Sequence, residues 1–162
     1  MKPHAGGASR VVGKAVRSSL IGIEREVGAR AYRASNELKN ASLHVLRGHR
    51  SGRSYRVPYT RRTYRASAPG EPPATRTGAF RMSWAANVTV ARAGGRFTAT
   101  SSIESGRRAE SGRGAGGGGA GPLLGEMLER GSPRMAPRPY KQAIRERAMP
   151  AIRRLYGQPY KI

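Results

Sequence analysis

The sequence contains no cysteine and no aspartate, so its nine acidic residues are all glutamates. The absence of cysteine excludes disulfide bonds, thiolate nucleophiles and thiolate zinc sites. Aromatic residues make up only 6% of the 162 residues and hydrophobic residues 37%, which is enough for one domain with a modest core. No apolar run approaches the roughly 20 residues of a membrane span, and the first residues lack the apolar segment of a signal peptide. We therefore expect a soluble protein that has no membrane contact and is assembled in the cytoplasm.

Residues that could perform catalysis or bind a metal are few and scattered. His4, His44 and His49 have no carboxylate at a spacing typical of metal ligands. Glu24 and Glu26 are two positions apart and would point to different faces of a helix. We therefore predict no catalytic residues, no metal site and no cofactor.

Arginine is the residue present in excess. The chain has five lysines and 26 arginines against nine glutamates, and its formal net charge is +22. Because guanidinium groups pair with carboxylates and phosphates, this balance indicates an anionic partner, either nucleic acid or an acidic protein surface. An arginine-rich codon bias would explain the preference for arginine over lysine, but not the shortage of acids. Free copies with this charge repel one another, so we expect the protein to work in an assembly.

Residues 9–46 have the pattern of one long helix, with Ser9 as its N-cap and Gly48 after its end. Apolar residues recur in steps of three or four, at Val12, Val16, Leu20, Ile23, Val27, Ala31, Ala34, Leu38, Ala41 and Val45. Such a helix is on the order of 55 Å long, more than so small a core can cover. We expect one part to lie on a sheet and the other on a neighbouring subunit. A coiled coil is the alternative.

Residues 47–65 are rich in arginine and tyrosine and contain no acid. The arginines are Arg47, Arg50, Arg53, Arg56, Arg61, Arg62 and Arg65. This mixture suits phosphate contacts and base stacking, so these residues are candidate contacts for DNA or another anion. The alternative is an edge hairpin whose arginines are solvated or pair with glutamates of a neighbouring chain.

The middle of the chain predicts an extended arm followed by a β-hairpin. Residues 47–78 form the arginine-rich and proline-rich arm, in which the prolines favour an extended conformation at low ordering cost. Residues 79–104 form the hairpin, because apolar residues alternate from Phe80 to Val90 and again from Phe97. A turn containing Gly94 and Gly95 joins the two strands.

The last third of the sequence predicts a loop and two helices. Residues 105–121 are glycine-rich but lack the Lys-Ser or Lys-Thr pair that closes a phosphate-binding loop, so we interpret them as an insertion loop. Residues 122–156 predict two short helices, the first of which ends at Gly131. The predicted fold class is α+β, with a long N-terminal helix packed on a small antiparallel sheet, two shorter C-terminal helices and the extended proline-rich arm.

Two pairs of short motifs follow one another in the chain: SAPGEPPA at 67–74 with TGAFR at 77–81, and LERGS at 128–132 with MAPRPY at 135–140. Together they resemble the motifs of a family of small tail-completion or head–tail joining proteins of long-tailed bacteriophages, a resemblance that covers most of the chain. The motif positions are Thr77, Gly78, Arg81, Glu129, Gly131, Arg138, Pro139 and Tyr140. The chain differs from the family at Arg130, where an aromatic residue is usual.

The resemblance implies a virion protein without catalytic activity, located at the neck of the particle as a homo-oligomeric ring and assembled in the host cytoplasm. Its implied partners are the portal, adaptor or head-closure protein on one side and tail terminator or tail tube proteins on the other, with possible contact to the packaged double-stranded DNA. The alternative is a non-specific nucleic-acid-binding protein that uses residues 47–65.

The resemblance also suggests roles for individual residues. We expect residues 66–76 to clasp a neighbouring subunit through Pro69, Gly70, Glu71, Pro72 and Pro73. A further hypothesis pairs the Arg138 guanidinium with a carboxylate across the turn, for which Glu129 is the candidate.

Overall fold

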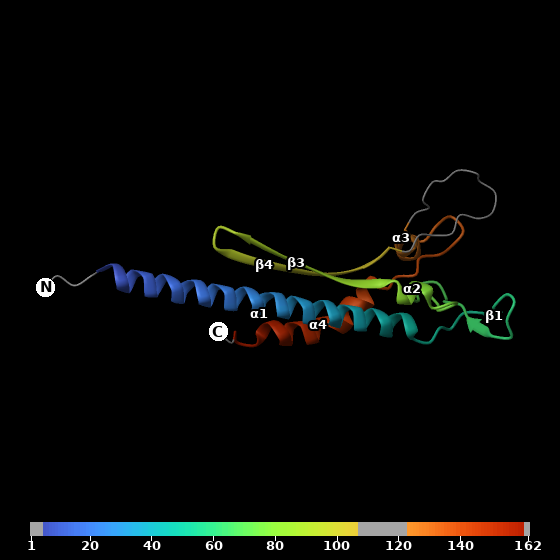
Figure 1. The fold of residues 1–162 in the computed structure, drawn as a ribbon. Helices are drawn as coiled ribbons and strands as arrows, with labels where there is room; N and C mark the ends of the chain where they lie inside the picture. The colour runs from blue at the N-terminus through green and yellow to red at the C-terminus, as the bar shows by residue number, and fades with distance from the viewer. Residues whose placement is uncertain (1–4, 107–122, 161–162) are drawn as a thin grey trace.

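The computed structural model describes residues 5–106 and 123–160, and it confirms the predicted α+β class (Figure 1). In chain order its elements are α1 (Ala5–Arg47), β1 (Ser54–Arg56), β2 (Thr63–Arg65), α2 (Ala79–Met82), β3 (Trp84–Ala93), β4 (Arg96–Ser105), α3 (Leu124–Arg130) and α4 (Lys141–Gly157). The strands form two separate antiparallel ribbons, β1–β2 and β3–β4. The predicted glycine-rich insertion lies almost entirely outside the described residues.

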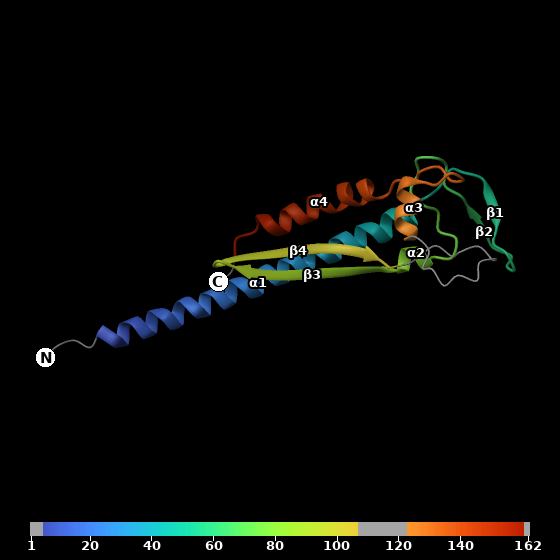
Figure 2. The same ribbon diagram turned by 90° about the horizontal axis from the view of Figure 1, so that it is seen from above.

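Helix α1 is the frame of the molecule. It has 43 residues, hence a length of about 65 Å. It begins at Ala5, so Ser9 lies inside the helix rather than at its N-cap, and it ends at Arg47, directly before the predicted stop at Gly48. Its N-terminal part extends beyond every other element (Figures 1 and 2).

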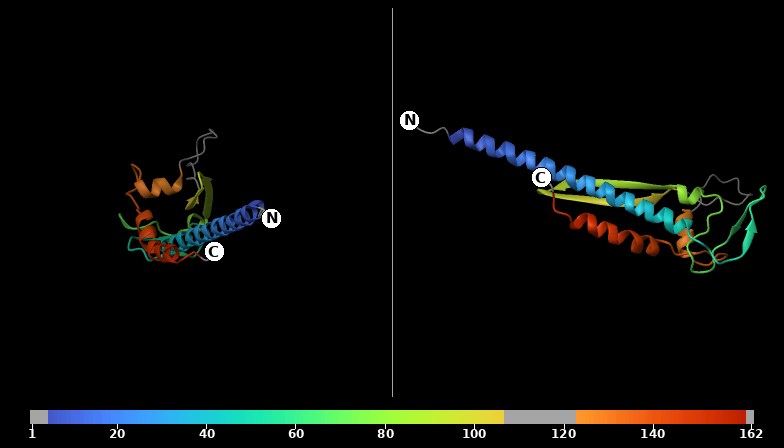
Figure 3. Two further views of the ribbon diagram at one scale, coloured as in Figure 1. Left: turned by 90° about the vertical axis from the view of Figure 1, so that its left-hand side faces the viewer. Right: turned by 90° about the horizontal axis from the view of Figure 1, so that it is seen from below.

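The β3–β4 ribbon covers one side of α1, and α4 packs beside α1 (Figure 3). The two strands pair along all ten residues of each, and the turn between them consists of Gly94 and Gly95, with φ of 55° and 76°. This is the two-residue turn that the sequence predicted, and its positive φ values explain both glycines. A ribbon of ten residue pairs is only about 33 Å long, so it covers about half of α1.

The prediction of a strand from Phe80 onward is wrong for its first residues. Phe80 and Met82 lie in the helical turn α2, and β3 begins at Trp84. Residues 80 and 84 are four positions apart. This spacing places two side chains on the same face of a strand, where every second residue points to one side, and also on the same face of a helix, where residues i and i+4 are neighbours. In the structure Met82 is 70% exposed, whereas the rings of Phe80 and Trp84 pack edge to face at 5.6 Å.

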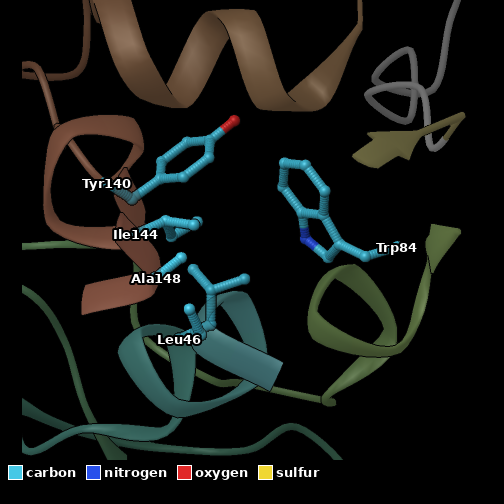
Figure 4. Packing of buried hydrophobic residues seen from close by; sticks show 6 residues of the cluster. Leu46, Trp84, Tyr140, Ile144 and Ala148 are labelled. Carbon is cyan, nitrogen blue, oxygen red and sulfur yellow. The ribbon is translucent and has the colours of Figure 1, made fainter. Parts of the chain in front are cut away.

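The core is small and lies at the C-terminal end of α1 (Figure 4). Leu46 of α1, Trp84 of β3, and Tyr140 and Ile144 at the start of α4 are all buried there. The Tyr140 ring lies 5.8 Å from the rings of both Phe80 and Trp84, in edge-to-face geometry. Aromatic pairs of this kind contribute about 0.5–1.5 kcal/mol beyond their buried area. The cluster joins α1, the β3–β4 ribbon and α4.

The C-terminal residues lie against the middle of α1. The Arg30 side chain is 2% exposed and donates hydrogen bonds to the carbonyl oxygens of Gln158 and Pro159, both at 2.6 Å. Its guanidinium also pairs with the Glu26 carboxylate at 3.0 Å and lies 4.0 Å from the centre of the Tyr160 ring. In residues 5–106 and 123–160, no helix is long and apolar enough to cross a membrane.

We predict that Ile144→Ala destabilises the fold by about 2–5 kcal/mol, because it removes a buried side chain from the core. Urea unfolding followed by circular dichroism measures the change. Ile21→Ala is the matched control: Ile21 is 60% exposed, so its truncation should change the unfolding free energy of the monomer by less than about 0.5 kcal/mol. Equal effects of the two substitutions would contradict the position of the core.

Candidate functional site: the loop and hairpin at the end of α1

Residues 66–78 fold back on their own chain instead of forming a free arm, so the prediction of an extended arm is wrong for this part. The Thr75 hydroxyl donates to the Leu46 carbonyl oxygen at 2.7 Å, and the Ser67 hydroxyl donates to the Pro72 carbonyl oxygen at 2.7 Å. The prolines stiffen the segment as expected, but it forms a loop over the end of α1. Contact of its exposed residues with another subunit stays a prediction.

Arg50 is the residue that holds this loop on α1. Its side chain is 9% exposed and donates to the carbonyl oxygens of Val45, Gly48, His49 and Pro73 at 2.8 to 3.2 Å. The last carbonyl groups of a helix have no partner within it, so Arg50 caps the end of α1. Burial lowers the pKa of its guanidinium, and the nearby Glu71 carboxylate partly opposes this shift.

Glu71 closes the base of the loop. Its carboxylate accepts hydrogen bonds from the Ser51 hydroxyl at 2.6 Å, from the Ser51 amide at 3.0 Å and from the Ala68 amide at 2.9 Å. These bonds, led by that from the Ser51 hydroxyl, lower the pKa of Glu71 to about 2. The carboxylate predicted to reach a neighbouring subunit is therefore engaged within its own chain.

The two motif stretches of the sequence meet in the structure. The Gly70 amide donates to the Pro137 carbonyl oxygen at 3.2 Å, and Arg138 donates through Nη1 to the Ser67 carbonyl oxygen at 2.6 Å. The hypothesis that Arg138 pairs with Glu129 is therefore wrong. Arg138 instead ties the start of α4 to the proline-rich loop.

Glu129 caps helix α4. Its Oε2 atom accepts from the amides of Tyr140 at 3.0 Å and Lys141 at 3.3 Å, which is the position that an N-terminal carboxylate favours. The Tyr140 hydroxyl donates to the Gly125 carbonyl oxygen at 3.0 Å. Burial, followed by the charges of Glu129 and Glu126, raises the pKa of Tyr140 to about 12.

Two of the motif glycines are needed for their backbone conformation. Gly78 directly precedes α2 and Gly131 follows α3, and both have φ of 80°. A Cβ at Gly131 would lie 2.7 Å from the Met135 carbonyl oxygen. The Thr77 hydroxyl oxygen accepts a hydrogen bond from the Ala79 amide at 3.3 Å. Pro139 directly precedes Tyr140, which is the N-cap residue of α4.

Arg81 is the motif residue with a buried nitrogen that has no hydrogen-bond partner in the described part of the chain. Its Nε atom and the indole nitrogen of Trp84 are buried without a hydrogen bond among the described residues. This burial does not explain why the motif has an arginine at position 81.

The seven candidate arginines of residues 47–65 differ in burial and position. Arg50 is buried as a helix cap and is excluded as an anion contact. The other six are exposed: Arg47, Arg53, Arg56, Arg61, Arg62 and Arg65. Arg47 belongs to α1, and the remaining five lie on the hairpin at the end of the molecule opposite the N-terminus of α1 (Figures 1 and 2). These residues therefore form a hairpin, which is a separate two-stranded ribbon, and what its arginines contact stays a prediction.

Backbone hydrogen bonds close the hairpin at its base. The Gly52 amide donates to the Ala66 carbonyl oxygen at 3.0 Å, and the Ala66 amide donates to the Arg53 carbonyl oxygen at 2.9 Å. A Cβ at Gly52 would lie 2.6 Å from the Ala66 carbonyl oxygen, so only glycine fits this close approach.

Within the described residues, no group of three or more histidine, aspartate, glutamate or cysteine side chains could hold a metal ion. A comparison with known protein families, curated proteins and solved structures finds no match to the chain.

We predict that Glu71→Gln destabilises the protein at neutral pH and that this effect disappears in acid. The pKa of Glu71 is depressed in the folded state, so its contribution to stability is present above its unfolded pKa of about 4.3 and is lost as the pH falls toward 2. Urea unfolding midpoints between pH 7 and 2.5 measure the difference between the two proteins.

Glu146→Gln is the matched control for this prediction, because Glu146 is exposed on α4 and accepts one bond from the Gln142 side chain. This variant should follow the wild-type protein across the pH range. A deficit of Glu71→Gln that stays constant from pH 7 to pH 2.5 would contradict the assigned role of its carboxylate.

Proposed function

We propose that this chain is a non-catalytic structural protein of the neck of a long-tailed bacteriophage, where copies of it form a ring that joins head and tail. The observation that carries the proposal is the uncovered N-terminal part of α1. Its apolar residues Val11, Val12, Val16 and Ile21 are 69%, 62%, 53% and 60% exposed.

In the part of the chain that the structure describes, no other element covers the start of α1 (Figure 2). The β3–β4 ribbon lies against α1 at Gly28, where a Cβ would lie 3.8 Å from the Val90 side chain. Toward Ala5, α1 continues past the end of the ribbon, and residues 14–19 are all exposed (Figure 2). Burying an exposed valine or isoleucine contributes about 1.5–3 kcal/mol. The helix is therefore suited to pack on another chain, and its Val12 and Val16 lie one turn apart on the same face.

The folded position of the two motif stretches supports the resemblance from which the neck role comes. Residues 67–74 and 128–140 are far apart in the sequence, yet they form one unit through the Gly70–Pro137 and Ser67–Arg138 hydrogen bonds. The motif residues Gly78, Glu129, Gly131 and Tyr140 each have a definite structural task in this unit. A shared fold explains why such motifs would occur together and in this order.

The proline-rich loop would contact a neighbouring subunit as a preformed edge rather than as a free arm. Its backbone is bonded within the chain, so it does not extend freely as the stiff clasp that we expected from the sequence, and its contact with a neighbouring subunit stays a prediction. Its exposed residues Pro69 and Gly70 lie at a stiff edge. A preformed edge loses little conformational entropy on docking to a neighbouring subunit.

We predict that the protein self-associates in a concentration-dependent manner and that Val12→Ser/Val16→Ser shifts it to the monomer, because serine removes apolar area from the exposed stripe. Sedimentation equilibrium at about 0.3 M salt, where repulsion between copies is screened, measures the change. Ala15→Ser is the control, since Ala15 lies on the same helix and is exposed. Equal association of all three proteins would contradict an interface on α1.

The position in the virion is tested separately by quantitative mass spectrometry of purified phage particles. The proposal expects the chain in intact virions at a fixed ratio to the portal protein. Particles that join heads to tails normally in its absence would contradict the neck role.

A further inference from the structure

We propose that the hairpin of β1 and β2 is a binding site for duplex nucleic acid, which it contacts with arginines on both faces of a two-stranded ribbon. This proposal does not rest on the neck role, because it concerns the end of the molecule opposite the uncovered part of α1 (Figure 1). Self-association and duplex binding are measured separately, so either can fail alone.

Within residues 5–106 and 123–160, no ion pair neutralises the positive charge of the hairpin. No glutamate occurs between Glu37 and Glu71 in the sequence, and the Glu71 carboxylate is engaged by Ser51 and Ala68. The five arginines of the hairpin are exposed, and none pairs with a carboxylate among the described residues. Five like charges on a ribbon of this size repel one another, and an anionic partner removes that cost.

The register of the strands places arginines on both faces. Tyr55 lies opposite Tyr64, with stacked rings 5.9 Å apart. Side chains alternate along a strand, so Arg53 and Arg62 share the face of this tyrosine pair. Arg56, opposite Thr63, and Arg65, opposite Ser54, share the other face.

This arrangement fits the shape of a duplex. A two-stranded ribbon is one of the elements that the major groove of B-DNA, about 12 Å wide, can admit. Arginines on the two faces of such a ribbon can reach the phosphates on the two sides of the groove. The tyrosine pair adds a flat apolar surface on one face, which suits contact with sugars and base edges.

The tip of the hairpin carries a second, independent signal. Pro58 and Tyr59 form a turn in which the Thr60 amide donates to the Val57 carbonyl oxygen at 3.2 Å. Tyr59 has φ of 61°, a conformation that this turn normally reserves for glycine, and its side chain is fully exposed. A strained backbone at an exposed aromatic residue is typical of a binding site rather than of a structural turn.

A duplex is favoured over an acidic protein surface by the uniformity of the charge. Duplex DNA presents one negative charge per about 1.7 Å of its axis, whereas the hairpin has arginines along its whole length and no acid to match a mixed surface. A second copy of this chain is a poor occupant, because it has nine glutamates against 31 basic residues. Of these glutamates, Glu26, Glu71 and Glu129 are already engaged within the fold.

Fluorescence anisotropy with a labelled duplex of about 20 base pairs tests the proposal, with affinity measured across a salt series from about 50 to 300 mM. The hairpin variant is Arg53→Gln/Arg62→Gln/Arg65→Gln. If three phosphate contacts are lost, binding should weaken by at least about 30-fold, and the slope of log affinity against log salt should flatten by about 2 to 3.

The matched control is Arg145→Gln/Arg147→Gln/Arg154→Gln, which removes the same charge from exposed positions of α4. This control should lose less than about threefold in affinity, because it changes only the overall charge of the protein. Equal losses in the two triple variants would overturn the proposal. So would a hairpin variant that unfolds at the wild-type urea midpoint and binds the duplex as tightly as the wild type.

Tyr59→Gly separates binding from folding. Glycine accepts the positive φ at this position, so the thermal midpoint should stay equal or rise, while duplex affinity should fall by about 5-fold or more. Unchanged affinity would exclude Tyr59 from the site. Poly-glutamate of matched charge is the final comparison, and tighter hairpin-dependent binding of this polymer than of the duplex would identify an acidic protein as the partner and overturn the proposal.

Discussion

The capped C-terminal end of α1 is the point on which the rest of the structure depends. The carbonyl groups at a helix end need partners outside the helix, and here Arg50 and Thr75 supply them. In the same turn the Leu46 side chain enters the core with Trp84 and Tyr140. One helix end therefore fixes the core, the proline-rich loop and the base of the hairpin. A buried guanidinium keeps its charge, and its bonds to carbonyl oxygens offset part of the desolvation cost.

Among the described residues, this arrangement leaves both ends of the molecule uncovered. Buried residues of α1 extend from Leu46 back to Arg30, whereas the first part of α1 extends away on one side and the β1–β2 hairpin on the other. The two ends differ in chemistry, since one presents valine and isoleucine and the other arginine and tyrosine. A chain with two unlike exposed ends is suited to contact two unlike partners at once.

The sequence predicted those elements whose signal is local. The periodicity of α1, the glycine pair at 94 and 95 and the stop at Gly131 depend on neighbouring residues, and all three are present. The helical turn α2 was missed because the apolar residues 80 and 84 fit the two-residue period of a strand as well as the i, i+4 spacing of a helix.

The fold of the candidate site was missed for a different reason. Arg50 and Glu71 act through carbonyl and amide groups about 20 residues away, and such contacts leave no spacing signal in one sequence. Buried and exposed arginines also look identical in a list of charges, so the sequence placed Arg50 among the anion contacts. A pairing of Arg138 with Glu129 followed from their opposite charges, yet backbone groups satisfy both side chains. Composition counts charges, whereas the fold decides which of them face outward.

The balance of charge links the two ends of the molecule. Three glutamates serve the fold through Arg30, Ser51 and the N-terminus of α4, so few acids are left to screen the 31 basic residues. Packing several such chains through α1 raises the positive potential of the assembly, and this repulsion opposes the apolar contacts. A polyanion bound at the hairpins lowers the same potential. Because coupling between two sites is reciprocal, an anion that favours assembly must also bind more tightly to the assembled form. The repulsion that excess arginine causes between free chains then favours the complex that includes the anion.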